Sequence, residues 1–345
     1  MPSRIIGHRM ALKVQVETLT IHPARPFAIA RATTREKTVV IVQVGRGLGE
    51  AAAYRSHGDT LEGVLAFLQE AEAVLGDDPF ALEEIERRLH RLAAGHTSAK
   101  NALLMALYDH VGQELGVPVY RLLGLSGTPV PTSYTIGLGT PEEMVRDLKA
   151  HPGFPAYKIK VGQPGDLEIL QELRRHTEKP FRVDANGAWY PKEAVQKIQR
   201  MADLGVELVE QPVPPDDLEG LAYVTTRSPL PVFADESVHT AADLPRLVGR
   251  VDGINIKLAK SGGIREALRM VAIARAFHLK VTLGCMVETS LGITAAAHIA
   301  SLADFVDLDG AYLLADDPFE GAWIQEGHLR VPDTPGLGVR RRHDL

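Results

Sequence analysis

The stretch "AYKIKVG" (156–162) places Lys158 and Lys160 two residues apart in an otherwise apolar run of β-forming residues. Successive side chains of a strand point to opposite faces, so both ammonium groups lie on the same face. A third lysine, Lys257, ends a similar run in "INIKLAK". Lysines at strand ends could remove and return protons if their surroundings lower the pKa from its usual value of about 10.4.

Acidic residues end three other apolar runs: Asp184 in "FRVDANG", Glu210 in "VELVEQP" and Asp235 in "VFADES". A single acid at a strand end is commonly a helix cap, but these three follow one another at spacings of 26 and 25 residues. Converging carboxylates repel one another strongly unless a cation lies among them. Hard oxygen ligands without His or Cys favour Mg²⁺, with Mn²⁺ as the alternative.

These residues lie in a region, from about residue 131, where short apolar runs recur about every 25 residues and helical patterns separate them. Eight such runs predict a parallel (β/α) barrel, whose active site lies at the C-terminal ends of its strands. A doubly wound open sheet is the competing architecture, but the even length of the units favours closure. The predicted strands cover residues 133–138, 156–161, 181–184, 206–210, 231–235, 253–257, 280–285 and 305–308.

The first third of the chain has an α+β pattern. Residues 3–20 and 38–45 alternate like strands, and "GRGLGE" (45–50) is predicted to be the turn that follows them. Helical patterns occupy roughly 60–76, 80–94 and 98–116. The polar tail is predicted to leave the barrel and to pack on the first domain. The expected division is a capping domain at 1–125, the barrel at 126–320 and a returning segment at 321–345.

Composition limits the partners and the compartment. A net charge of −6 argues against nucleic acid or an anionic membrane surface. The single cysteine, Cys285, excludes an intrachain disulfide and fits a reducing compartment. The N-terminal residues have no apolar h-region, and no apolar run approaches the ~20 residues that span a bilayer. We expect a cytoplasmic protein.

The strand-end pattern resembles the enolase superfamily, specifically its muconate-lactonizing subgroup, which uses a Lys or His base with Mg²⁺. The resemblance covers almost the whole chain and includes "GLGEAA" and "NALLMALYDHVGQELGVPVYRLLG". It implies a modified (β/α)7β TIM barrel, with an α+β cap formed by the N-terminal region and the C-terminal tail. It also implies that Lys160 and Lys257 are the acid/base pair. The implied metal ligands are Asp184, Glu210 and Asp235.

Two neighbouring lysines need separate interpretation. Lys158 beside Lys160, together with a divalent cation, would lower the pKa of Lys160 toward the range of about 7–8 that suits proton abstraction. Lys158 itself would stay charged and support the developing enolate. Lys260 also follows the strand in "NIKLAKSGG", but strand alternation predicts that it faces away from Lys257. The base is therefore assigned to Lys257.

The reaction that this core implies starts with removal of an α-proton from a carboxylate bound to the metal. A lysine on each face can return the proton from the opposite side, which gives epimerisation or racemisation. Cycloisomerases and o-succinylbenzoate synthases share the lysines but eliminate instead. Retention of both lysines and all three acids argues against a non-catalytic binding protein.

The segment "DLDG" places Asp307 and Asp309 on one face of the last strand end, where they suit a substrate ammonium. A turn or helix cap is the structural alternative. The pair resembles the D-x-D motif of dipeptide epimerases, which holds the amine of the dipeptide. N-succinyl amino acid racemases and muconate cycloisomerases bind no free amine, so the motif favours a dipeptide.

Further substrate contacts are predicted from the resemblance. Thr135 in "TSYTIGL" and Cys285 and Val287 in "CMVETSLGITAAAH" should line the pocket wall, the latter two through backbone groups. The stretch "PARPFAIARATTRE" (23–36) should form a flexible loop that closes the pocket. Arg31 resembles the loop arginine that meets the glutamate side chain in L-Ala-D/L-Glu epimerases, with Arg25 and Arg35 as competitors. The favoured substrate is Ala-Glu, and a homo-oligomer is expected.

Overall fold

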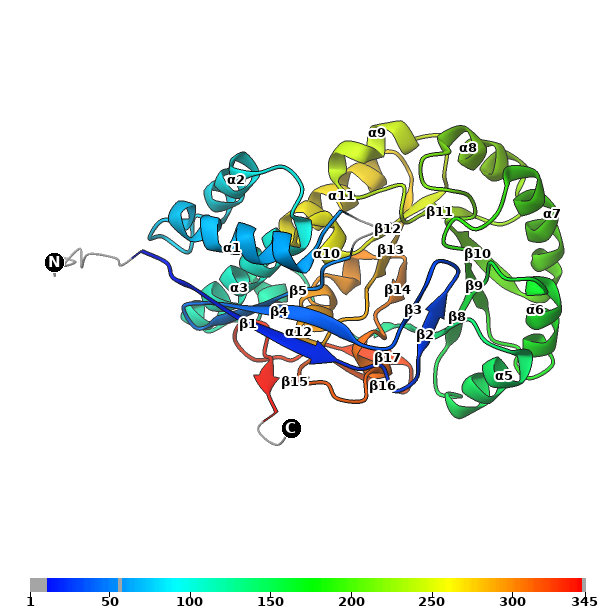
Figure 1. The fold of residues 1–345 in the computed structure, drawn as a ribbon, viewed down its shortest axis with the longest axis horizontal. Coiled ribbons are helices and arrows are strands. Elements are labelled where there is room, and N and C mark those ends of the chain that lie inside the picture. The colour runs from blue at the N-terminus through cyan, green and yellow to red at the C-terminus, as the bar shows by residue number, and fades with distance from the viewer. Residues whose placement is uncertain (1–10, 55–57, 343–345) are drawn as a thin grey trace, which may run out of the picture.

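The computed structural model describes residues 11–54 and 58–342 of the chain. Eight parallel strands form a barrel in chain order, and a layer of antiparallel strands and helices lies beside it (Figure 1). The barrel strands are β7 (Ser133–Ile136), β8 (Ala156–Lys160), β9 (Phe181–Asp184), β10 (Val206–Glu210), β11 (Val232–Ala234), β12 (Gly253–Ile256), β13 (Lys280–Gly284) and β14 (Phe305–Asp307).

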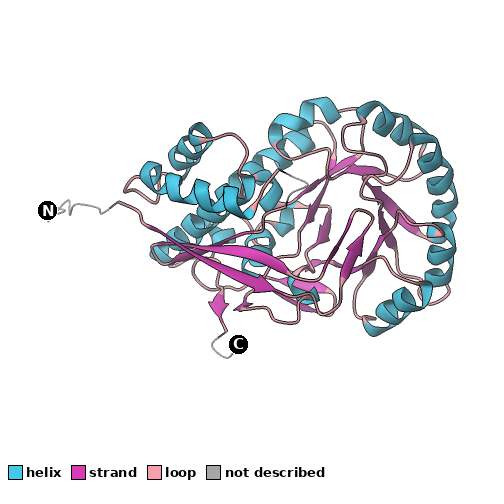
Figure 2. Cartoon of the chain, in the orientation of Figure 1, coloured by secondary structure: helices cyan, strands magenta, loops and turns pink. Residues whose placement is uncertain are grey.

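Helices connect each barrel strand to the next and surround the sheet (Figure 2). Seven connections carry a helix and β14 ends the series, so the predicted (β/α)7β barrel is confirmed in the described residues. The outer helices are α5 (Pro141–Ala150), α6 (Asp166–Arg174), α7 (Pro191–Met201), α8 (Leu218–Arg227), α9 (Leu244–Leu247), α11 (Ile264–Ala276) and α12 (Ser290–Ala297), and the short α10 (Leu258–Ser261) follows β12.

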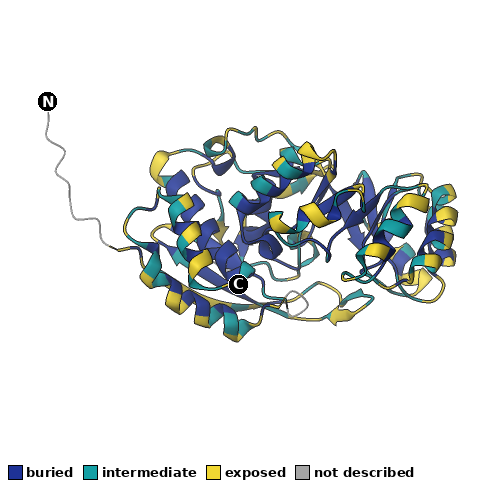
Figure 3. Ribbon diagram, turned by 90° about the horizontal axis from the view of Figure 1, so that it is seen from above, coloured by how far each residue is buried: buried dark blue, intermediate teal, exposed yellow. Residues whose placement is uncertain are grey.

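Side chains close the barrel between its first and last strands. The hydroxyls of Thr132 and Ser133 donate to the Val306 carbonyl at 3.4 and 3.5 Å, and the Leu308 N–H donates to Thr132 Oγ1 at 3.1 Å. Strand alternation explains the burial of β8: Tyr157 and Ile159 join the apolar layer, whereas the lysines face inward. Figure 3 shows the same division, with buried strands inside and exposed residues on the outer helix faces.

The layer beside the barrel is antiparallel. Its strands are β1 (Val14–Ile21), β4 (Lys37–Val44) and β5 (Gly47–Ala51), and residues 3–10 of the predicted first strand lie outside the described residues. The helices match the predicted ranges closely: α1 (Leu61–Leu75), α2 (Leu82–Leu92), α3 (Thr97–Leu115), followed by the short α4 (Val119–Leu122).

The prediction that "GRGLGE" is only a turn was wrong. The turn is confined to Gly45 and Arg46, and the following residues form β5, which pairs with β4. The glycines allow this strand to lie directly on α3, because a Cβ on Gly49 would come within 1.9 Å of the Ala102 carbonyl oxygen.

The predicted flexible loop at 23–36 contains a β-hairpin. Strands β2 (Phe27–Ile29) and β3 (Ala32–Thr34) pair antiparallel around a two-residue turn. In Figure 1 this hairpin reaches from β1 across the barrel toward β8. The Leu138 N–H donates to the Ala28 carbonyl at 2.8 Å, which joins β2 to the end of the first barrel strand.

The chain after β14 returns to the layer of antiparallel strands and helices beside the barrel. Arg341 forms an ion pair with Glu17 of β1, and the Leu337 N–H donates to Asp109 of α3 at 2.7 Å. No helix in the described part of the chain is long and apolar enough to span a membrane. The remaining strands are β6 (Val130–Pro131), β15 (Phe319–Glu320), β16 (Trp323–Gln325), β17 (His328–Arg330) and β18 (Arg340–Arg341).

Candidate active site

Three carboxylates from consecutive strand–helix units converge at the centre of the barrel rim. Asp184 ends β9, Glu210 ends β10, and Asp235 follows β11. One oxygen of each lies within 4.8 Å of the others, and all three residues are buried. Buried anions at this separation repel unless positive charge lies among them. The oxygen-only donor set fits the divalent cation predicted from the sequence.

Lys160 and Lys257 lie at different members of this acidic triad. Lys160 Nζ is 2.6 Å from Asp184 Oδ2, and Lys257 Nζ is 2.6 Å from Asp235 Oδ2. Burial lowers the pKa of Lys257, but the charges of Asp235, Glu210 and Glu236 together outweigh it, and the pKa lies above its usual value. The two amines therefore contact different carboxylates of the triad, which is compatible with a two-base arrangement.

Lys158 is surrounded by carboxylates. Its Nζ lies 2.7 Å from Asp307, 3.0 Å from both oxygens of Glu210 and 3.2 Å from Asp184. Burial lowers the pKa of Lys158, yet these charges together hold it well above the usual value. Lys158 therefore offsets part of the negative charge of the rim and links the triad to the last strand, and strand alternation alone did not predict this link.

Asp307 and Asp309 are held together by Thr135. The Thr135 N–H donates to Asp309 Oδ2 at 2.6 Å, and its hydroxyl lies 3.0 Å from Asp309 and 3.2 Å from Asp307. Burial and the charge of Asp307 raise the pKa of Asp309 to about 7. Two buried carboxylates this close to each other favour a cationic partner.

One pocket between the hairpin and the rim brings together most of the predicted side chains. Cys285 is partly buried, and desolvation of its thiol raises the pKa well above the usual value, which argues for a wall residue rather than a nucleophile. The predicted residues that line this pocket are Thr135, Lys158, Lys160, Asp235, Lys257, Cys285, Val287, Asp307 and Asp309.

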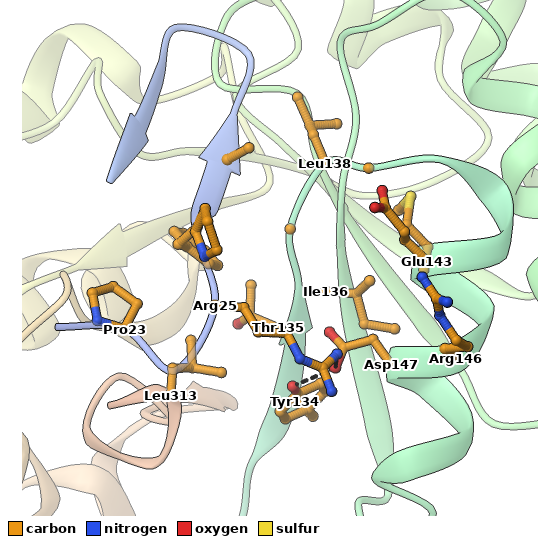
Figure 4. A pocket seen from close by; sticks show the side chains of 16 residues that line it. Pro23, Arg25, Tyr134, Thr135, Ile136, Leu138, Glu143, Arg146, Asp147 and Leu313 are labelled. Carbon is orange, nitrogen blue, oxygen red and sulfur yellow. Dashed lines mark hydrogen bonds and ion pairs between the residues drawn. The ribbon is translucent and has the colours of Figure 1, made fainter. Parts of the chain in front are cut away.

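The three candidate arginines are placed differently. Arg31 contacts the pocket rim, where its Nη2 lies 3.0 Å from Glu236 Oε1. Arg25 lies in a neighbouring cleft of about 560 Å³, where it donates to Asp147 at 3.0 Å (Figure 4). This larger cleft contains neither the lysines nor the triad, so the chemistry belongs to the smaller pocket. Arg35 is exposed.

Sequence reasoning missed or misplaced several residues of the site. Lys260 does not face away, because it lies on α10 rather than on a strand, and its Nζ contacts Asp235 Oδ1. Asn186 and Glu236 also line the pocket. They follow the metal-site acids closely in "DANG" and "DES", and this proximity in the sequence could have identified them as site residues. Tyr54 reaches the pocket from the cap, where its hydroxyl accepts from the Val287 N–H at 3.1 Å, and no motif indicated it.

Two family models match the chain. The mandelate racemase / muconate lactonizing enzyme N-terminal domain matches residues 13–124, and the enolase C-terminal domain-like model matches residues 142–345. The chain belongs to the mandelate racemase / muconate lactonizing enzyme family. This membership confirms the resemblance to the enolase superfamily.

Relatives in this family align over nearly the full chain. The L-Ala-D/L-Glu epimerase of Bacteroides thetaiotaomicron is 40% identical over 316 residues, which cover 90% of this chain and 82% of the relative. The substrate-liganded L-Ala-D/L-Glu epimerase from Bacillus subtilis has a TM-score of 0.91 at 36% identity and covers 95% and 98% of the two chains. The Enterococcus faecalis V583 dipeptide epimerase complexed with Mg and L-Leu-L-Tyr has a TM-score of 0.91 at 38% identity, covering 96% and 99%.

Proposed function

We propose that this protein is a Mg²⁺-dependent dipeptide epimerase, an isomerase that inverts the α-carbon of the C-terminal residue of a dipeptide. The observation that carries the proposal is the buried Asp307–Asp309 pair, placed in the same pocket as the lysines. Lys158 already pairs with Asp307, so a free ammonium would balance the second carboxylate of the pair, and a dipeptide provides such an ammonium. The similarity to proteins named dipeptide epimerases supports the same conclusion.

The catalytic roles follow from the positions of the side chains. When bound by Asp184, Glu210 and Asp235, Mg²⁺ supplies positive charge that stabilises the negative charge developing on the substrate carboxylate. Lys160 and Lys257 exchange the α-proton, one removing it and the other returning it on the opposite face. Lys158 stays charged and offsets the acids of the rim. Asp307 and Asp309 bind the ammonium.

The substrate that we propose first is L-Ala-D/L-Glu, because two of the similar proteins described above carry that name. Such an enzyme would act in the metabolism of cell wall peptides. A hydrophobic dipeptide is the alternative within the same chemistry, and the E. faecalis relative was crystallised with L-Leu-L-Tyr. N-acyl or N-succinyl amino acid racemisation and o-succinylbenzoate synthesis or cycloisomerisation are less favoured, because their substrates bring no ammonium to Asp309, whereas Asp307 is already paired with Lys158.

The expected partner is thus a small dipeptide. The net charge of −6 and the single cysteine support a cytoplasmic enzyme without a nucleic acid or membrane partner. We also propose that it forms a homo-oligomer.

Proton exchange in D₂O tests the function. We expect the C-terminal α-proton signal of L-Ala-L-Glu to disappear in ¹H NMR spectra as L-Ala-D-Glu forms. EDTA should stop both changes and Mg²⁺ should restore them. Exchange of N-succinyl amino acids but of no free dipeptide would favour the racemase alternative. Full activity in metal-free protein would contradict the role of the acidic triad.

A further inference from the structure

The β2–β3 hairpin is held over the pocket at two separate places. At its base, the Ala24 N–H donates to the Leu313 carbonyl at 2.8 Å, and Arg25 forms the ion pair with Asp147 of α5. At its tip, Arg31 Nε donates to the Asn186 carbonyl at 2.7 Å, and the guanidinium also pairs with Glu236. The two anchors therefore fasten the hairpin to different parts of the barrel.

The partners of Arg31 belong to the loops that carry the metal-site acids. The Asn186 N–H donates to Asp184 Oδ1 at 2.9 Å, and Glu236 follows Asp235 directly in the chain. Asn186 Nδ2 also donates to Glu236 Oε1 at 3.1 Å, so one carboxylate oxygen joins Arg31 to both loops. A displacement of either loop would therefore change the contacts that hold Arg31 at the hairpin tip.

The barrel backbone leaves room for the tip at two glycines. Gly162 follows β8, and a Cβ there would lie 2.9 Å from Ala30 Cβ. Gly187 follows Asn186, and a Cβ there would lie 3.0 Å from Arg31 Nη2. Their φ values of 110° and 75° fall in the left-handed region that favours glycine. The close packing of the hairpin tip against the barrel thus depends on the backbone at these glycines as well as on the ion pair of Arg31.

We propose that Arg31 is a positioning residue that couples closure of the β2–β3 hairpin to Mg²⁺ binding. Metal ligation fixes the loops of Asp184 and Asp235, and those loops hold Arg31. Because coupling free energies are reciprocal, the contacts of Arg31 with these loops should stabilise Mg²⁺ binding by as much as Mg²⁺ binding stabilises those contacts. The inference rests on the proposed function, because it requires Mg²⁺ at the acidic triad, and it gives Arg31 a task other than recognition of an acidic side chain.

Hydrogen exchange and calorimetry test this coupling without any substrate. We expect Mg²⁺ to slow amide exchange in residues 27–34 of the wild type. In Arg31→Ala this protection by Mg²⁺ should be lost, and Mg²⁺ should bind about fivefold or more weakly. Arg31→Lys keeps the positive charge but loses the guanidinium group, whose separate nitrogens reach both loops. The affinity of this variant for Mg²⁺ should therefore lie between those of the wild type and Arg31→Ala. Arg25→Ala is the matched control at the base and should keep the wild-type Mg²⁺ affinity.

The outcomes separate the inference from the proposed function. If the wild type binds no Mg²⁺, both are overturned. If it binds Mg²⁺ and Arg31→Ala matches it in affinity and protection, only the coupling is overturned. A third measurement compares substrates: Arg31→Ala should lower kcat/KM for L-Ala-L-Glu and L-Ala-L-Leu by the same factor. A selective loss for L-Ala-L-Glu would overturn the positioning role in favour of side-chain recognition.

Discussion

The barrel rim and the hairpin enclose one pocket but are held by different forces. The rim lysines and acids are almost fully buried, and each lies at a strand end fixed by the parallel sheet. The hairpin has short strands, and the side chain of Arg31 remains 39% exposed. An ion pair this exposed contributes little by itself, typically less than about 1 kcal/mol.

This difference suggests that the rim carries the catalytic groups, whereas the hairpin controls entry of the substrate into the pocket. Buried charges cannot move without losing their partners, so the rim keeps the lysines and acids in a fixed geometry. We expect the hairpin to move more readily than the rim, as admission of a substrate to a covered pocket requires. Changes at the rim should therefore remove activity, and changes near the periphery should adjust it.

The largest effects are expected at the two lysines. Lys160→Ala and Lys257→Ala should each abolish epimerisation, since general base catalysis typically contributes about 10²–10⁴-fold. Each variant should still exchange the α-proton of the one epimer whose proton faces the remaining lysine. NMR in D₂O with each epimer as the substrate measures this. Equal exchange of both epimers by both variants would contradict one lysine per face.

A smaller loss is expected at the amine site. Asp307→Asn should weaken recognition of the dipeptide ammonium, and an N-acetylated dipeptide should be a poor substrate for the wild type. Loss of a charge-assisted contact with buried groups left unpaired costs about 2–5 kcal/mol, or a factor of tens to thousands in kcat/KM. Steady-state kinetics with paired free and acetylated dipeptides provide the measurement. Acetylated substrates that outperform free ones would refute the role of this pair.

Much of the rim could be predicted from the sequence because β/α units repeat. The predicted strand at 156–161 corresponds to β8, and the run at 206–210 corresponds to β10 without change. In a parallel barrel all strand C-termini share one end, so an acid or lysine at a strand end already has a known place. The gathering of Asp184, Glu210 and Asp235 followed from that rule.

The hairpin and the cap residues could not be predicted in the same way. Strands β2 and β3 have three residues each, which is too short for an alternation signal, and contacts with the barrel hold them. The strand β5 was hidden because its glycines resemble a turn, whereas they permit contact with α3. Lys260 was misplaced because a helix begins directly after β12, which changes the period from 2 to 3.6.

The mildest expected effect is a pH shift that compares the two acids of the amine site. Because the pKa of Asp309 is about 7 in the substrate-free protein, its carboxylate is charged above that pH and protonated below it. Ammonium binding, and with it kcat/KM, should therefore fall as the pH decreases through about 7. The charge of Asp307 helps to raise this pKa, so Asp307→Asn should move the fall to lower pH. The measurement is kcat/KM for a free dipeptide from pH 5 to 9 in both proteins. If the fall stayed at the same pH, it would belong to a group that does not respond to the charge of Asp307, and its assignment to Asp309 would be refuted.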